Sequence, residues 1–123
     1  MNLSKSKEDY LEAILMIEKT KNKVKSVDIA RFLNVSKPGV TKAMNALRED
    51  GYIEDSYYSE IVLTNSGRLQ ASEILYKHNT IRNFLIMLGV DKENAEIDCC
   101  KIEHVISDKT FEQIKNFINK KGD

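Results

Sequence analysis

Four side chains that could bind a metal recur at helical spacing in the last third of the chain. They would share one face of a helix predicted over residues 94–106, within roughly 100° at 100° per residue: Glu96, Cys100, Glu103 and His104. Thiolate, carboxylate and imidazole groups all bind divalent transition metals. Such spacing also arises by chance on any polar helix face, so it indicates a metal site only if further ligands converge there.

The chain has one other histidine, and it lies where such a site could use it. His78 falls in the apolar stripe of a long helix predicted from Thr64 or Ser66 to Leu88. A buried imidazole needs a polar partner, which a metal or a backbone carbonyl can supply. Asp9 and Glu12, one turn apart on an earlier helix, could add oxygen ligands, although two acids on a surface helix are commonly only solvated.

The first half of the chain is predicted to contain a helix-turn-helix. Apolar residues at helical spacing predict a helix over residues 4–19, followed by a polar connector. Ser26 is expected to cap a two-turn helix, and Ser36 to cap a third helix with Pro38 in its first turn and Gly51 at its end. Two short helices joined by a tight turn, the second bearing basic side chains, are typical of DNA-binding proteins.

A β-hairpin of wing size is predicted next. The β-prone segments 52–55 and 60–64 flank a polar loop, after which the remaining residues are predicted to be helical, over 64–88, 94–106 and 108–119. The predicted fold class is therefore mainly α. A winged helix-turn-helix domain is expected over residues 1–64, and an all-helical metal-binding and dimerisation domain over residues 65–123.

Charge is distributed unevenly although the net charge is zero. Residues 21–48 carry seven lysine and arginine side chains against one aspartate, whereas residues 51–123 carry nine basic against twelve acidic side chains. The basic segment coincides with the predicted helix-turn-helix, although lysines of this kind can also be a solvated helix face. A positive first half and a negative second half suggest two different tasks.

Composition points to the cytoplasm. The chain is 41% apolar and 31% charged, which is typical of a globular protein, and it has neither a membrane-length apolar stretch nor an apolar leader in residues 1–7. Its only cysteines, Cys99 and Cys100, are adjacent and could not staple distant segments, so a reducing compartment is the simpler inference. No membrane association is expected.

Four segments together resemble the diphtheria toxin repressor and manganese transport regulator family of metal-dependent transcriptional repressors. They are residues 8–12 (EDYLE), residues 62–67 (VLTNSG), His78, and residues 100–104 (CKIEH). The resemblance covers essentially the whole chain, and the length is similar to the short manganese branch, which lacks an SH3-like domain. It implies a repressor of metal-uptake genes that binds double-stranded operator DNA as a homodimer through its C-terminal helices, with no small organic substrate.

The resemblance also implies a set of metal ligands: Asp9, Glu12, His78, Cys100, Glu103 and His104. Asp9 and Glu12 are similar to the manganese branch, whereas Cys100 is similar to the iron branch. Arg82 and Glu96 stand where the iron branch would have ligands of an ancillary site, so that site is not expected. The cofactor is predicted to be Mn²⁺ or Fe²⁺, with one or two ions per subunit, and other divalent cations such as Zn²⁺ are expected to substitute in vitro.

The third helix and the wing supply the expected DNA contacts. The helix would enter the major groove, Gly39 would permit close approach, and the wing tyrosines would reach the backbone. The expected contact residues are Ser36, Lys37, Pro38, Gly39, Thr41, Lys42, Asn45, Tyr57 and Tyr58.

Two other functional classes compete with this hypothesis. The chain could be a winged-helix regulator that ignores metal, or one that responds to oxidation of Cys99 and Cys100. Cys100 and His104, one turn apart, could also be the nucleophile and base of a small hydrolase. No glycine turn near Cys100 could form an oxyanion hole, and a nucleophile within a helix is poorly exposed, so no enzyme activity is expected.

Overall fold

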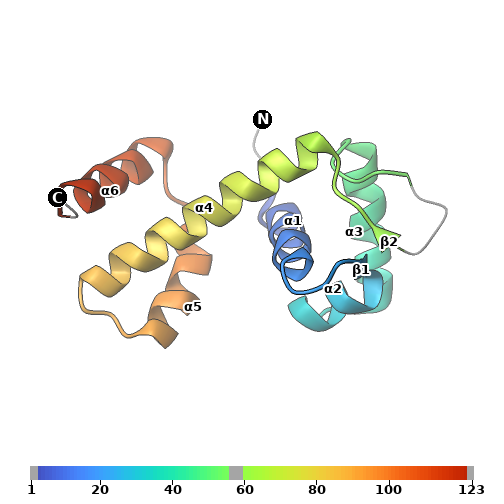
Figure 1. Cartoon of the computed structure of the whole chain (residues 1–123), viewed down its shortest axis with the longest axis horizontal. Helices are drawn as coiled ribbons and strands as arrows, with labels where there is room; N and C mark the ends of the chain where they lie inside the picture. Colours follow the sequence, from blue (N-terminus) through green and yellow to red (C-terminus); the bar gives the residue numbers. More distant parts are fainter. Residues whose placement is uncertain (1–2, 56–59, 122–123) are drawn as a thin grey trace. The chain divides into compact units, whose positions relative to one another are not determined.

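The computed structural model describes residues 3–55 and 60–121, which fold almost entirely into helices (Figure 1). The elements are α1 (Lys5–Glu18), β1 (Val24–Lys25), α2 (Ser26–Leu33), α3 (Lys37–Glu49), β2 (Glu60–Ile61), α4 (Asn65–Met87), α5 (Lys92–Ile102) and α6 (Asp108–Lys121). This confirms the predicted, mainly α fold class. None of the described helices is long and apolar enough to cross a membrane.

The chain divides into two compact units, and the division falls inside α4. The first unit runs from Met1 to Glu73 and the second from Ile74 to Asp123. The domain boundary predicted between residues 64 and 65 lies at the start of the same helix and stays a prediction.

The helix-turn-helix is formed by α2 and α3. Asn34 adopts the left-handed conformation (φ 56°) that ends α2, and the amide of Val35 donates to the carbonyl of Ala30 at 3.0 Å. The side chain of Ser36 then caps α3 by accepting from the amide of Gly39 at 3.1 Å, as predicted.

The start of α2 differs from the prediction by one residue. Ser26 was expected to be the N-cap, but it is the first residue of α2, and Lys25 occupies the capping position. The Asp28 carboxylate accepts from the amide of Lys25 at 3.0 Å and thereby satisfies a donor at the helix start. An acid in the first turn replaces the serine hydroxyl in this role.

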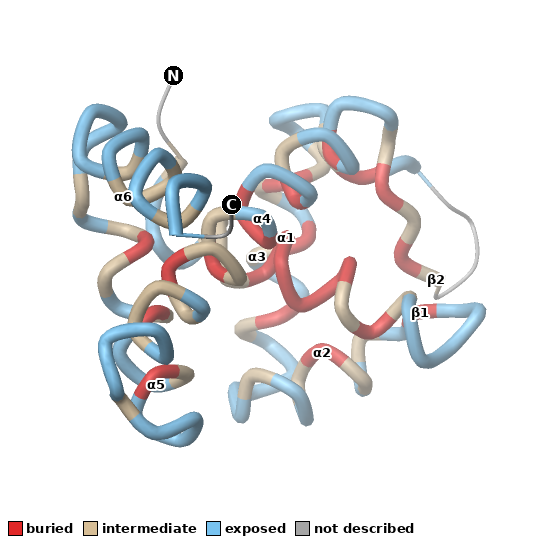
Figure 2. Tube along the Cα trace, turned by 60° about the vertical axis from the view of Figure 1, so that its left-hand side comes forward, coloured by how far each residue is buried: buried red, intermediate tan, exposed pale blue. Residues whose placement is uncertain are grey.

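The core of the first unit lies among α1, α2 and α3 and under the wing. Side chains from every element of this unit are fully or almost fully removed from solvent (Figure 2). They include Leu11, Ile14, Val24, Ile29, Val40, Leu47 and Ile53. Burial of these apolar side chains is the main stabilising contribution, about 1.5–3 kcal/mol for each large one. The core therefore fixes α3 relative to α1 and α2.

The wing is broader than the predicted hairpin. Ile53 and Leu63 form an antiparallel bridge, as expected for two segments of a hairpin, but β2 pairs with β1, with Val24 opposite Ile61. Residues 19–25 were predicted to be only a polar connector. The single apolar residue Val24, 1% exposed, anchors this strand, and one apolar residue is too weak a pattern to predict one. Tyr57 and Tyr58 lie outside the described residues.

Thr64 joins the wing to α4. Its hydroxyl donates to the carbonyl of Gly51 at 2.6 Å and accepts from the amide of Gly67 at 3.0 Å, so one side chain caps α4 and closes the wing. Gly67 itself is buried against the backbone of Tyr52, where a Cβ atom would collide with the Tyr52 carbonyl. The first turn of α4 and the base of the wing are therefore in direct backbone contact.

The second unit consists of the C-terminal part of α4 together with α5 and α6. Leu88 and Gly89 end α4, with Gly89 at φ 105°, and the side chain of Asp91 caps α5 by accepting from the amide of Asn94 at 3.1 Å. Helix α6 has no buried residue (Figure 2). It contacts α4 through edge-to-face ring pairs, Tyr76 with Phe111 and Phe84 with Phe117.

Gly67→Ala is expected to destabilise the first unit. Because the new methyl group would meet backbone rather than a movable side chain, α4 and the wing must separate, at a cost of about 1–3 kcal/mol. Urea unfolding should show a lower midpoint at unchanged m-value. Ser66→Ala, at the exposed neighbouring position, is the control; equal midpoints for the two variants would contradict the close contact.

Candidate metal centre

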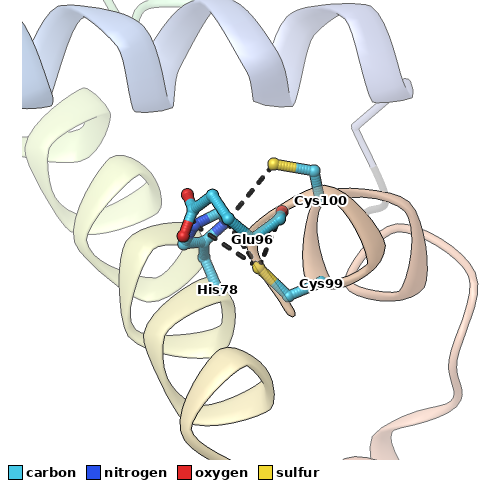
Figure 3. Close-up of side chains that lie close together, drawn as sticks. All are labelled: His78, Glu96, Cys99 and Cys100. Atoms are coloured by element: carbon cyan, nitrogen blue, oxygen red, sulfur yellow. Dashed lines mark hydrogen bonds and ion pairs between the residues drawn. The ribbon is translucent and has the colours of Figure 1, made fainter. Parts of the chain in front are cut away.

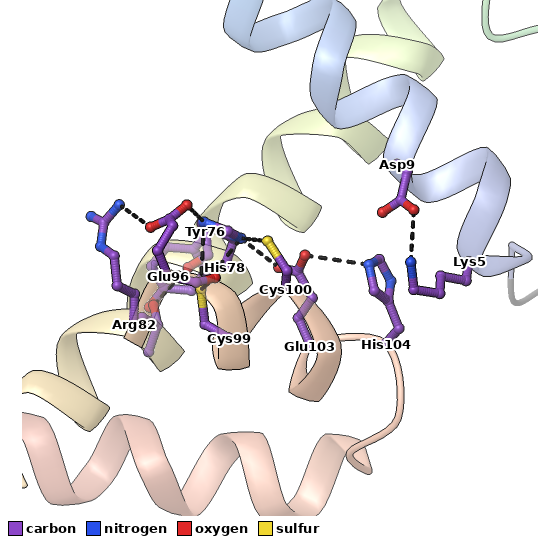
Figure 4. A network of polar contacts seen from close by, with 11 residues as sticks. Lys5, Asp9, Tyr76, His78, Arg82, Glu96, Cys99, Cys100, Glu103 and His104 are labelled. Atoms are coloured by element: carbon purple, nitrogen blue, oxygen red, sulfur yellow. Dashed lines mark hydrogen bonds and ion pairs between the residues drawn. The ribbon is translucent and has the colours of Figure 1, made fainter. Parts of the chain in front are cut away.

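A buried carboxylate between two imidazoles is the centre of the candidate site. The side chain of Glu103 is 1% exposed; its Oε2 lies 3.2 Å from Nδ1 of His78 and its Oε1 lies 3.3 Å from Nε2 of His104 (Figure 4). Among the described residues, no group donates a hydrogen bond to either oxygen. A carboxylate removed from water in this way is stable only beside positive charge.

His78, on α4, contacts both this carboxylate and an acid within α5. It extends from α4 toward α5, is 2% exposed, and its Nε2 lies 2.7 Å from Oε1 of Glu96 (Figure 3). The other oxygen of Glu96 lies 3.5 Å from the guanidinium of Arg82. Each ring nitrogen of His78 therefore faces an acid, and Arg82 orients one of the two.

Both cysteines of α5 also face His78. Sγ of Cys99 lies 3.5 Å from Nε2 and 3.6 Å from Nδ1 of His78, and Sγ of Cys100 lies 3.8 Å from Nδ1. Cys99 is fully buried, whereas Cys100 is partly exposed. Burial, and to a smaller extent the charges of Cys100, Glu96 and Glu103, together raise the pKa of the Cys99 thiol to about 12.

The end of α5 corrects the helical-face argument. The sequence predicts one helix over residues 94–106, but α5 runs from Lys92 to Ile102, Glu103 is its C-cap residue, and His104 follows it. The predicted convergence of Cys100, Glu103 and His104 nevertheless occurs. It depends on the turn after α5, which directs Glu103 and His104 toward one point, and not on a continued helix face.

Asp9 and Glu12 are both on α1, in the first unit. The Asp9 carboxylate accepts a hydrogen bond from Nζ of Lys5 at 2.9 Å, one turn earlier on the same helix (Figure 4). Glu12 is 7% exposed, so it is not a solvated surface acid. Their participation in a metal site stays a prediction.

The residues of the second unit fit a divalent cation. One ligand atom from each of His78, Glu96, Cys99 and Cys100 lies within 4.8 Å of the other three, and the Glu103 carboxylate has no hydrogen-bond donor among the described residues. Nitrogen, sulfur and oxygen donors together suit the transition metals from manganese to zinc. His78 thus contacts acids and a thiol, which are groups of the kind that bind cations.

Sequence reasoning did not identify Cys99 as a candidate ligand. It was assigned to the apolar stripe of α5, because residues 95, 99, 102 and 106 repeat at helical spacing. Cys99 is indeed buried, but its thiol also reaches His78. A cysteine in an apolar stripe that faces a histidine in another such stripe is the signal that could have revealed it.

The predicted DNA-contacting residues with described positions lie at the start and along α3. Lys37, Pro38, Thr41, Lys42 and Asn45 are exposed, whereas Gly39 is partly buried. Several already have local partners: the Ser36 oxygen caps α3, the Thr41 hydroxyl donates to the carbonyl of Lys37, and the Asn45 oxygen accepts from Arg48. Lys37 and Lys42 add two positive charges to this exposed surface.

Two family models match the chain in succession. One describes the N-terminal DNA-binding domain of iron-dependent repressors and matches residues 2–61; the other describes their metal-binding and dimerisation domain and matches residues 64–121. An uncharacterised HTH-type transcriptional regulator of Methanocaldococcus jannaschii is 39% identical over 96% of this chain and 96% of its own length. The HTH-type transcriptional regulator MntR of Bacillus subtilis is 34% identical over 92% of this chain and 80% of its own length.

Solved structures share the fold. The structure of IdeR of T. acidophilum superposes on this chain with a TM-score of 0.82 at 26% identity. The match covers 97% of this chain and 55% of the IdeR chain. The manganese regulator SloR superposes with a TM-score of 0.80 at 28% identity, with coverage of 97% and 55%. The chain thus spans about half the length of these structures.

The two cysteines are expected to differ sharply in reactivity toward iodoacetamide. With a pKa of about 12, Cys99 is a thiolate in only about one molecule in 10⁴–10⁵ at pH 7.5, and its fraction rises tenfold per pH unit below the pKa. Tandem mass spectrometry of the metal-free chain should locate label on Cys100 first. In a Cys100→Ser variant, labelling should require urea; rapid native labelling of that variant would show that Cys99 is accessible.

Proposed function

The chain belongs to the iron-dependent repressor family of metal-responsive transcriptional regulators, and on that premise we propose that Mn²⁺ or Fe²⁺ controls its binding to operator DNA. Family membership itself covers the DNA-binding, metal-binding and dimerisation domains. The proposal concerns which residues of this chain bind the metal, which bind DNA, and which metal acts.

The observation that carries the proposal is the buried Glu103 carboxylate, held 3.2–3.3 Å from two imidazole nitrogens. We assign Glu103, His78, His104 and Cys100 to the ligand set from their mutual geometry. Asp9 and Glu12 are assigned from the sequence resemblance, which places two acids of the first helix in the same set. A bound cation would add positive charge to this group of acids, of which Asp9 already pairs with the ammonium of Lys5.

The chain's own residues then define two states. Without metal, Asp9 is paired with Lys5, and Glu103 depends on the two imidazoles for positive charge. With metal, the acids of α1 and of the second unit would share one ion, so that binding selects one placement of the DNA-binding helices. In a homodimer, that placement would set the distance between the two α3 helices and match them to a palindromic operator.

Helix α3 is the proposed reading element. Lys37 and Lys42 are exposed on it and bear the charge needed for phosphates, while Thr41 and Asn45 lie near the same face. Ser36, Pro38 and Gly39 form the first turn, where close approach to DNA is possible. Tyr57 and Tyr58 remain proposed backbone contacts of the wing.

Manganese is preferred slightly over iron as the physiological metal. Carboxylates outnumber the single thiol in the proposed set, and oxygen ligands suit Mn²⁺, whereas Cys100 favours Fe²⁺. The manganese regulator SloR, which shares the fold at 28% identity, supports the preference.

A redox-responsive regulator is the remaining alternative, and the structure gives it little support at Cys99. Cys99 is fully buried and its pKa is raised to about 12, so that it is a poor nucleophile toward peroxides at neutral pH.

Manganese should raise the affinity of the chelator-treated chain for DNA from the promoters of metal-transport genes by at least about tenfold. His78→Ala and Glu103→Ala should each abolish this gain, because each removes a central ligand. Fluorescence anisotropy measures it, with Fe²⁺ under anaerobic conditions and Zn²⁺ in parallel. Glu112→Gln, an exposed acid of α6, is the control. Equal affinity with and without every metal would refute metal control, and a gain with Fe²⁺ alone would reverse the metal preference.

Lys42→Ala should weaken DNA binding in the presence of metal and lower the slope of log affinity against log salt by about one, as expected for one lost phosphate contact. Lys109→Ala, which removes an equal charge from the first turn of α6, should change neither quantity. If Lys42→Ala bound DNA with the affinity and salt slope of the unmodified chain, Lys42 would not be a DNA contact.

A further inference from the structure

We propose that His78, Glu96, Cys99 and Cys100 form a second ligand set, which binds zinc entirely within the second unit. One ligand atom from each of these four residues lies within 4.8 Å of the other three (Figure 3). The set shares His78 and Cys100 with the ligands assigned above, but it replaces the oxygens of the other acids with Cys99 and Glu96. It requires no residue of α1.

The distances match a tetrahedral zinc site. With Zn–S bonds of about 2.3 Å and Zn–N bonds of about 2.05 Å, a sulfur and a nitrogen on one ion lie about 3.6 Å apart. The Cys99 sulfur lies 3.5–3.6 Å from the ring nitrogens of His78, and the Cys100 sulfur lies 3.8 Å from Nδ1. An ion takes only one nitrogen of the ring, and Glu96 contacts Nε2. At Nε2, Cys99 already has the spacing that it would have around zinc, whereas Cys100, which contacts Nδ1, must shift toward Nε2 to share the ion.

Glu96 needs only a small movement to complete the set. Its Oε1 is 2.7 Å from Nε2 of His78, which is a hydrogen-bond distance, whereas an oxygen and a nitrogen on one zinc ion lie about 3.4 Å apart. The side chain of Glu96 is 46% exposed, so it can move by this amount without disturbing the core. Four protein ligands would close the site, as in structural zinc sites.

The charges around this set also balance. Two thiolates and one carboxylate carry three negative charges, of which zinc neutralises two. The Arg82 guanidinium, 3.5 Å from Oε2 of Glu96, supplies the remaining positive charge and holds the carboxylate in place. Arg82 thus acts on the ion through Glu96 and is a positioning residue.

Sulfur content distinguishes the occupants of the two sets. Thiolates are soft ligands that favour zinc over manganese, and this set contains both cysteine thiols of the chain. Because the sets share His78 and Cys100, one ion excludes the other. This mutual exclusion of the two ions rests on the proposed function, whereas the zinc site itself does not. Zinc in the cysteine set would then occupy the chain without engaging Asp9 or Glu12.

Cobalt titration of the full, metal-free chain under anaerobic conditions tests the site. Co²⁺ replaces zinc in tetrahedral sites and shows an intense visible spectrum, with a sulfur-to-cobalt band in the near ultraviolet that grows with the number of bound thiolates. We expect that band to be halved in Cys99→Ser and in Cys100→Ser, and to be absent from the double variant. A weak octahedral spectrum without the band, or a band unchanged by Cys99→Ser, would overturn the proposal.

Zinc affinity, measured in competition with a chromophoric chelator, gives a second readout. Cys99→Ser and Glu96→Gln should each weaken zinc binding by at least about tenfold. Glu96→Gln changes an exposed side chain, so a folding defect of Cys99→Ser cannot hide the result. Glu112→Gln, an exposed acid of α6 outside both ligand sets, is the matched control, and a loss equal to that of Glu96→Gln would overturn the proposal. Manganese-dependent DNA binding by the unmodified chain is measured in parallel; its absence would refute the proposed function and leave the cobalt result to decide the zinc site.

Discussion

The electrostatics of the second unit depend on one buried carboxylate. Glu103 is removed from water, and the positive ends of two imidazoles are its only near compensation among the described side chains. Because an isolated charge is costly in a protein interior, this arrangement favours a cation beside the carboxylate. Three features hold this carboxylate where a cation can reach it. They are the turn after α5, the placement of His78 on α4 and the capping of α5 by Asp91.

The fold was predictable wherever a cap or an apolar stripe was strong. Ser36 with Pro38 marks the start of α3, and the positive φ of Gly89 follows the end of α4 as expected of a helix-terminating glycine. The start of α2 was predicted one residue too late. The carboxylate of Asp28, in the first turn, accepts from the amide of Lys25 and stabilises the helix start in place of a capping serine. Strand β1 was missed since its pairing partner lies far along the chain, where no local pattern can specify it.

The identity of the residues in the candidate site could be predicted better than the local structure that positions them. Residue chemistry and spacing selected Cys100, Glu103 and His104, yet the helix expected to align them ends at Ile102. Their convergence is a property of the turn, which periodicity cannot predict. Cys99 was overlooked because burial and metal binding are not exclusive for a thiol: the same side chain fills an apolar stripe and faces His78.

Helix α6 contributes no buried residue and is fastened mainly by two edge-to-face ring pairs with α4. Local stability scales with buried apolar contact, so α6 has little holding it in an isolated subunit. Its amide protons should therefore exchange with solvent through frequent local opening, on a timescale distinct from that of the helices around Cys99. Any association that covers Phe111 and Phe117 would slow that exchange, which makes α6 a natural internal reporter of the assembly state of the chain.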